Sequence, residues 1–150
     1  MNYIKVNSNG KVSIGGKVAT KKMLDEGWFQ YKGEIPKIDD TQYFTLDDNG
    51  KLVVNTDKEL ARKKAKQLKN KKLNNNTYTL SDGSVYQVRP QDFSNFQTAI
   101  QLGADTDWIL ADNTVRHTTV DELKEILSNG IKQVKAIYQE YIDTLKSIGE

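Results

Sequence analysis

The chain contains no cysteine and only one histidine, His117, among its 150 residues. Without cysteine, the protein can form neither disulfide bonds nor thiolate zinc sites, and it has no cysteine nucleophile. A lone histidine cannot build a zinc site, and no sequence context marks a nucleophile that would work with it. We therefore expect His117 to be structural or simply exposed.

The sequence also lacks long apolar runs and phosphate-binding motifs. No stretch approaches the ~18 apolar residues that a membrane span requires, and the N-terminus shows no signal-peptide pattern. Neither GxxxxGK followed by Ser or Thr nor GxGxxG occurs. Asp105 and Asp107 start like a calcium loop, but Ile109 stands at the fifth position and the glycine of the sixth is missing. We expect no catalytic residue, no bound cofactor and no metal, and hence no enzyme.

Charge is concentrated in one segment, although the net charge of the chain is only +2. The basic patch consists of Lys58, Arg62, Lys63, Lys64, Lys66, Lys69, Lys71 and Lys72. With Glu59 as the one acid in it, residues 58–72 carry +7, so the rest of the chain carries −5. Counterion release would favour phosphate binding here, but no aromatic residue is interleaved and no base-reading motif is present. We expect a solvated or partner-facing helix and disfavour nucleic acid as its ligand.

Residues 1–55 are predicted to form a small β-rich module. The sequences NSNG (7–10) and DDNG (47–50) each lie between two short apolar runs, which predicts two hairpins with Asn-Gly turns. Between them, the sequence TKKMLDE predicts a short helix that ends at Gly27, and WFQY predicts a strand.

Residues 56–150 are predicted to form a helical domain. Thr56 is expected to cap a helix over residues 57–72, and the segments 77–88 and 107–119 each predict a hairpin. A short helix is expected between Pro90 and Gly103. A capping box of Thr119 and Glu122 starts the last helix, which reaches Ile148 and is expected to pair with the helix 57–72 in antiparallel fashion. The fold class is therefore α+β, with a small strand-rich N-terminal module followed by a helical core with two inserted β-hairpins and a long C-terminal helix.

The last helix has the strongest periodicity in the sequence. Its apolar residues at alternating spacings of four and three form a heptad seam: Leu127, Ile131, Val134, Tyr138, Tyr141, Leu145 and Ile148. A weaker second stripe runs beside it: Leu123, Ile126, Gly130, Ile137 and Ile142. Either both stripes pack internally, or one covers the core while the seam contacts a partner, which makes the seam the candidate interface.

The order of segments from residue 58 to 148 resembles a known domain. The sequences VYQVRPQDFSNFQTAI, DWILADNTVRHTTVDELKEIL and YIDTLKSI are similar to a domain at the C-terminal end of many phage tail fibre, tail fibre assembly and other tail-region proteins. The matching positions are Arg89, Asp92, Phe96, Trp108, Asp112, Asn113, Thr118, Leu123, Tyr138, Leu145 and Ile148. Because the function of that domain is uncharacterised, the resemblance implies a phage-tail context and no reaction mechanism.

Five of these positions have structural explanations of their own. Arg89 can pair with Asp92, which can stabilise the free amides of a helix start. Trp108 is expected to be an apolar anchor packed on the long helix. Asp112 and Asn113 are expected to form a turn in which their side chains bind the local backbone.

These observations lead to three functional hypotheses. The first is a phage tail or baseplate accessory structural protein, linked to tail fibre attachment, that acts through protein–protein contacts in the virion tail. The second is a tail fibre assembly chaperone in the host cytoplasm. The third is a nucleic-acid or host-factor binding protein that uses the basic patch. The expected partners are tail fibre or baseplate proteins, or a second copy of the chain, and no membrane.

Overall fold

The computed structural model describes residues 1–149, and it divides the chain into two compact units. Unit 1 comprises Met1–Arg62 and unit 2 begins at Lys63. The division falls within helix α2 (Lys58–Asn74), whereas the sequence suggests a boundary after residue 55. Glu150, which the sequence analysis includes in the helical domain, lies outside the described residues. The predicted α+β class, with strands first and a long final helix, is confirmed.

Unit 1 is built on one antiparallel sheet of five short strands. The strands lie in the order β3 (Phe29–Tyr31), β1 (Asn2–Val6), β2 (Val12–Ile14), β4 (Gln42–Leu46) and β5 (Leu52–Thr56). Both predicted hairpins are present, since β1 pairs with β2 and β4 pairs with β5. Their turns place Gly10 and Gly50 at φ of 79° and 74°, where a residue with a side chain is strained.

The two hairpins contribute equivalent residues to the core of unit 1. Their buried residues are Ile4, Val12, Phe44 and Leu52. Each hairpin therefore supplies one apolar residue before its turn and one after it, and the strand β2 joins the two hairpins through its pairing with β4. The period-2 alternation of a half-buried strand accounts for this arrangement.

Side-chain caps fix the starts of the helices α1 and α2. Thr20 caps α1 (Lys21–Asp25), as its Oγ1 accepts a hydrogen bond from the amide of Met23 at 3.2 Å. The prediction that Thr56 caps α2 is wrong. Thr56 is the last residue of β5. The carboxylate of Asp57 instead accepts a hydrogen bond from the backbone amide of Leu60 at 3.1 Å. Since α2 begins at Lys58, Asp57 is the residue directly before its first turn, and Thr56 lies one residue too early to cap it.

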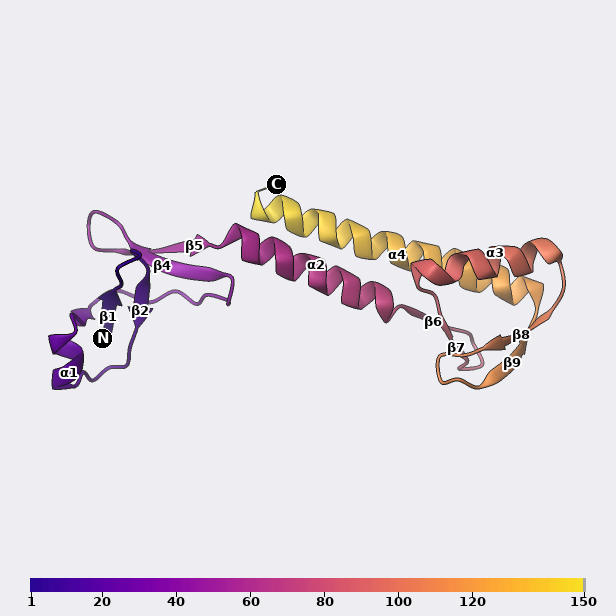
Figure 1. Ribbon diagram of the computed structural model, residues 1–150, viewed down its shortest axis with the longest axis horizontal. Coiled ribbons are helices and arrows are strands. Elements are labelled where there is room, and N and C mark those ends of the chain that lie inside the picture. Colours follow the sequence, from indigo (N-terminus) through magenta and orange to yellow (C-terminus); the bar gives the residue numbers. More distant parts are fainter. Residues whose placement is uncertain (150) are drawn as a thin grey trace. The chain divides into compact units, whose positions relative to one another are not determined.

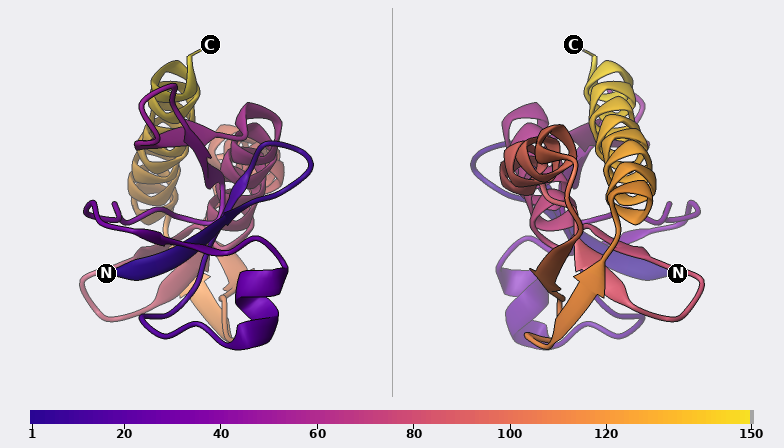
Figure 2. Two further views of the ribbon diagram at one scale, coloured as in Figure 1. Left: turned by 90° about the vertical axis from the view of Figure 1, so that its left-hand side faces the viewer. Right: turned by 90° about the vertical axis from the view of Figure 1, so that its right-hand side faces the viewer.

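Unit 2 contains two separate hairpins and three helices (Figure 1). After α2 come β6 (Thr77–Thr79), β7 (Val85–Gln87), the 3₁₀ turn η1 (Pro90–Asp92), α3 (Phe93–Leu102), β8 (Thr106–Ile109), β9 (Val115–Thr118) and α4 (Val120–Ile148). The strands pair as β6 with β7 and β8 with β9, both antiparallel, which confirms the two predicted hairpins. In the right-hand view of Figure 2, β9 leads directly into α4.

The core of unit 2 lies among the hairpins, α3 and the first turns of α4. It is formed by Leu80, Tyr86, Val88, Phe96, Ala99, Leu123 and Ile126. Gly130 of α4 is buried beside it, and a Cβ atom added there would lie 2.8 Å from the Cβ of Val88. The absent side chain thus lets the helix backbone approach the end of β7 closely.

Within unit 2, α2 and α4 lie side by side and run in opposite directions (Figure 1). Lys72 forms an ion pair with Glu140 at 2.7 Å, and one turn earlier Lys69 lies over the ring of Tyr141. The predicted antiparallel pairing is therefore confirmed for the part of α2 that belongs to unit 2. Within residues 1–149, no helix combines the length and the apolar character that crossing a bilayer requires.

The close approach at Gly130 predicts an unusual sign for a helix substitution. In an exposed helix, Gly→Ala stabilises by about 1 kcal/mol, but here the new methyl group would overlap Val88. We expect Gly130→Ala to lower the free energy of unfolding by about 1–3 kcal/mol through overpacking. Urea denaturation followed by circular dichroism would measure this, with the exposed Ser128→Ala as the control in the same helix. Equal or higher stability of Gly130→Ala would contradict the packing described.

Candidate functional site

Arg116 of β9 binds two carboxylates that come from different parts of unit 2. Its Nε donates a hydrogen bond to Asp82, in the turn between β6 and β7, at 3.0 Å. Its Nη1 and Nη2 donate to the two carboxylate oxygens of Glu122, in the first turn of α4, at 3.1 and 2.8 Å. Glu122 is also the acid of the capping box with Thr119, which confirms that prediction. One guanidinium therefore joins a turn, a strand and a helix start.

A chain of hydroxyl groups extends this network into the core. Arg116 donates to the hydroxyl of Tyr86 at 3.0 Å, and that hydroxyl lies 2.7 Å from Oγ1 of Thr118. Thr118 in turn donates to the carbonyl oxygen of Arg116 at 3.2 Å. Because arginine can only donate, Tyr86 must accept from it and give its own proton to Thr118. Both buried hydroxyl groups are thus satisfied.

The network stabilises the charged forms of its members. The hydrogen bonds from Arg116, followed by the one from the backbone of Thr119, lower the pKa of Glu122 to about 2. The hydrogen bond to Glu122 likewise raises the pKa of Arg116. The pKa of Asp82 is lowered mainly by its hydrogen bonds to Ser84 and also by Arg116. General acid–base catalysis needs a group with a pKa near the working pH, so this cluster has the electrostatics of a structural ion-pair network.

Two of the three predicted anchor contacts are confirmed, and the third differs from the prediction. Asp92 accepts hydrogen bonds from the backbone amide and from Nε of Arg89 at 2.9 and 2.8 Å, which confirms that pairing. Asp112 accepts from the amide of Thr114 at 3.0 Å, and Asn113 has a φ of 66°, which confirms the turn. The sequence predicts that Trp108 packs on the long helix, but its ring stacks on Phe96 of the short helix α3, with ring centroids 4.4 Å apart, and it is half-buried there.

His117 is exposed, and its Nδ1 lies 3.1 Å from a carboxylate oxygen of Asp107. Over residues 1–149, no cluster of three or more acidic or histidine side chains has an arrangement that could hold a metal ion.

The heptad seam is only partly buried. Val134 is buried, Leu127, Tyr141, Leu145 and Ile148 are half-buried, and Ile131 and Tyr138 are exposed by 43% and 42%. The buried face of α4 follows the stripe that the sequence marks as the weaker one, through Leu123, Ile126 and Gly130. At 3.6 residues per turn, the buried line is rotated by about 50° from the seam. The missing side chain of Gly130 lets this face of α4 approach Val88. The periodicity of the sequence gives no indication of this close approach.

Three exposed apolar side chains form a line along α4. Ile131, Tyr138 and Ile142 each have between 42% and 43% of their surface exposed. At 3.6 residues per turn, they fall within about 40° of one another around the helix. We call this line the α4 stripe; it combines two positions of the seam with one position of the second stripe.

The basic patch is divided between solvent and the helix pair. Lys69 lies over the rings of Tyr141 and Tyr138, at 4.7 and 5.5 Å from their centroids, and Lys72 is paired with Glu140. The charges of these two lysines are therefore engaged in contacts within the protein. The exposed members of the patch are Lys58, Lys63, Lys66 and Lys71.

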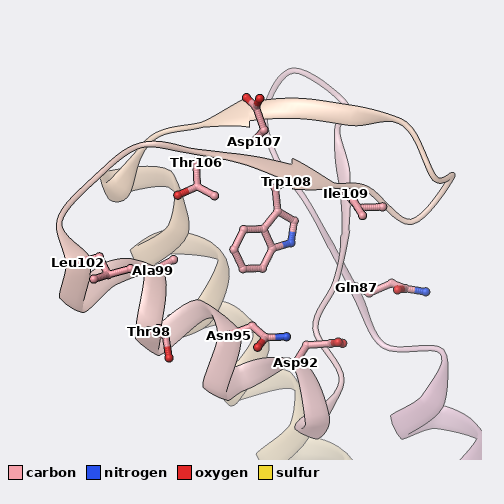
Figure 3. A pocket seen from close by; sticks show the side chains of 10 residues that line it. All are labelled: Gln87, Asp92, Asn95, Thr98, Ala99, Leu102, Thr106, Asp107, Trp108 and Ile109. Atoms are coloured by element: carbon pink, nitrogen blue, oxygen red, sulfur yellow. The ribbon is translucent and has the colours of Figure 1, made fainter.

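A hollow lies beside Trp108, and no sequence pattern indicates it. It has a volume of about 590 Å³ and lies between α3 and β8 (Figure 3). From α3 it is lined by Asn95, Thr98, Ala99 and Leu102, from β8 by Thr106, Asp107, Trp108 and Ile109, and otherwise by Gln87 and Asp92. The spacing of the α3 residues indicates one helix face, but nothing in the sequence places the hairpin over it.

The lowered pKa of Glu122 predicts how stability depends on pH. A carboxylate whose pKa is lower in the folded state stabilises the fold above its ordinary pKa of 4.5, and this contribution is lost as the pH falls toward 2. We expect Glu122→Gln to lower the free energy of unfolding by about 1–3 kcal/mol at about pH 7. The difference from the original protein should shrink as the pH falls below about 4.5.

Urea denaturation over this pH range would measure the effect. The control is Glu125→Gln, which removes an exposed carboxylate of the same helix. A difference that stays constant with pH would contradict the assigned role of Glu122.

The comparisons with known proteins identify one relationship. Residues 56–148 match the family described as "Domain of unknown function (DUF4376)". No curated protein and no solved structure matches the chain. The family match covers more than half of the sequence and includes every element of unit 2 from β6 to α4. The protein therefore belongs to the DUF4376 family.

Proposed function

We propose that the protein is a phage tail or baseplate accessory protein that acts through protein–protein contacts and is linked to tail fibre attachment. The phage context rests on the resemblance of residues 58–148 to the tail-associated domain, which is a sequence argument. The mode of action rests on the α4 stripe. As partners we propose other tail proteins, from the fibre or the baseplate.

The α4 stripe is the observation that carries this proposal. Ile131, Tyr138 and Ile142 lie on one side of a single rigid helix and are each more than two-fifths exposed. Apolar side chains that are aligned in this way mark interaction surfaces more often than scattered ones do. An amphipathic helix presents such residues to a partner groove at the spacing of the helical turns. The stripe therefore fits a protein partner.

The basic patch supports a protein partner better than a nucleic acid. The cations of Lys69 and Lys72 already contact α4, through aromatic rings and a carboxylate. Nucleic-acid affinity grows with the number of cations that reach phosphates. Cations that are engaged within the protein contribute less to such binding, so the third hypothesis is the weaker one.

Incorporation into particles tests the proposal. We expect the double variant Ile131→Asn and Ile142→Asn to reduce the amount of this protein in purified virions at least tenfold, because both apolar contacts would be lost. Both side chains are exposed, so the fold should be retained. The measurement is quantitative mass spectrometry of virions from a phage that carries each variant.

Lys132→Asn is the matched control, because it places the same side chain at an exposed position next to the stripe. Incorporation of the double variant at the level of the control would refute the role of the stripe. If the original protein is absent from particles and instead raises the yield of soluble fibre on co-expression, it is an assembly chaperone.

A further inference from the structure

The hollow between α3 and β8 has the volume of a small-molecule site and is open to solvent on one side. Its volume of about 590 Å³ lies within the range of roughly 300–1,000 Å³ that is typical of ligand pockets. Figure 3 shows the indole of Trp108 projecting from β8 into the hollow, with Asn95 and Ala99 of α3 beside it. The indole is the only aromatic ring in the lining.

Trp108 provides a rigid apolar surface in this hollow. It stacks on Phe96 with an angle of 23° between the rings, and Phe96 itself is completely buried. The indole is therefore fixed before any ligand arrives, so binding would order few additional groups. Its Nε1–H donates no hydrogen bond to any of the described residues, which leaves one donor free at the edge of the ring.

Neutral polar residues line the hollow, and of these Asn95 lies beside the indole in Figure 3. Asn95 and Gln87 are exposed, and within residues 1–149 their side-chain amides make no hydrogen bond. Each amide offers both a donor and an acceptor. The hydroxyl groups of Thr98 and Thr106 donate to nearby carbonyl oxygens, and each keeps an acceptor position. The lining thus presents donors and acceptors that carry no charge.

The charges around the hollow argue against an ionic ligand. No lysine or arginine lines it, so an anion such as a phosphate would find no cation there. Of the two carboxylates, Asp92 is bound by Arg89 through two hydrogen bonds from the guanidinium at 2.8 and 2.9 Å. Asp107 is turned away from the indole in Figure 3 and contacts His117 at 3.1 Å. Asp92 is therefore already paired and Asp107 points away from the indole, so neither carboxylate is placed to bind a cationic ligand against the ring.

We propose that this hollow binds a neutral saccharide of one or two pyranose rings. A pyranose has an apolar C–H face, which packs on an indole ring through dispersion. Its edge carries hydroxyl groups that both donate and accept, which matches the amide of Asn95 beside the indole. The exposed Leu102 and Ile109, at 76% and 66%, extend the apolar contact at the rim. This inference goes beyond the proposed function, because it does not involve the α4 stripe.

Nuclear magnetic resonance of the full chain tests the proposal. The probes are the methyl glycosides of glucose, galactose, mannose and N-acetylglucosamine at millimolar concentration. The protein contains two tryptophans, Trp28 and Trp108, so two indole N–H signals can be assigned with a Trp28→Phe variant. We expect at least one glycoside to shift the signal of Trp108 while that of Trp28 stays in place.

Two binding variants and one control separate binding from folding. Asn95→Ala removes one amide from the hollow and should weaken the affinity for that glycoside at least tenfold. Gln97→Ala is the matched control, because it removes an exposed amide that does not line the hollow from the same helix. Its affinity should stay within twofold of the original. Trp108→Phe keeps a ring for stacking on Phe96 but loses the Nε1 donor together with its signal. Its weaker binding is therefore measured on the signals of the glycoside.

Four outcomes would overturn the proposal. The first is that no glycoside shifts the Trp108 signal, and the second is that Asn95→Ala and Gln97→Ala bind alike. The third is that glucose 6-phosphate shifts the signal while the neutral glycosides do not, which would assign the hollow to an anion. The fourth is that a short apolar peptide shifts it while no glycoside does, which would assign it to a protein segment. Virion incorporation is measured separately, so failure of one proposal leaves the other testable.

Discussion

The guanidinium of Arg116 joins three parts of unit 2: the β6–β7 turn, the strand β9 and the start of α4. Asp82 and Glu122 reach it from segments that are far apart in the sequence, and Tyr86 links it to the buried core. Arginine keeps its charge at any physiological pH, and its planar donors bind several oxygens at fixed angles. Since Glu122 also belongs to the capping box with Thr119, the same carboxylate fixes both the start of α4 and its attachment to the hairpins.

Both candidate surfaces depend on this constraint. Arg116 lies directly opposite Trp108 in the β8–β9 pair, so the network that holds one strand also holds the indole over α3. The same network sets where α4 begins, and the contact of Gly130 with Val88 sets which face of α4 turns inward. Because the face with Gly130 turns inward, Ile131 lies on another side of the helix, and the α4 stripe is exposed.

The two surfaces differ in the ligand that each suits. The α4 stripe is a row of apolar side chains on one side of a helix. A protein partner with an apolar groove could bury these side chains. The hollow at Trp108 combines a fixed ring with neutral amides such as Asn95, and it offers a small polar molecule both stacking and hydrogen bonds. Membership of the DUF4376 family names no function. The support for the two binding surfaces therefore comes from their physical chemistry.

The sequence by itself determined the local structure: the Asn-Gly turns, the order of helices and strands, the capping box at Thr119 and the Arg89–Asp92 pair. Each depends on neighbouring residues and therefore leaves a local pattern. Tertiary structure alone decided the inward face of α4 and the hollow at Trp108. The approach of Val88 to Gly130 and the position of β8 over α3 join distant segments, and periodicity along one helix carries no information about them.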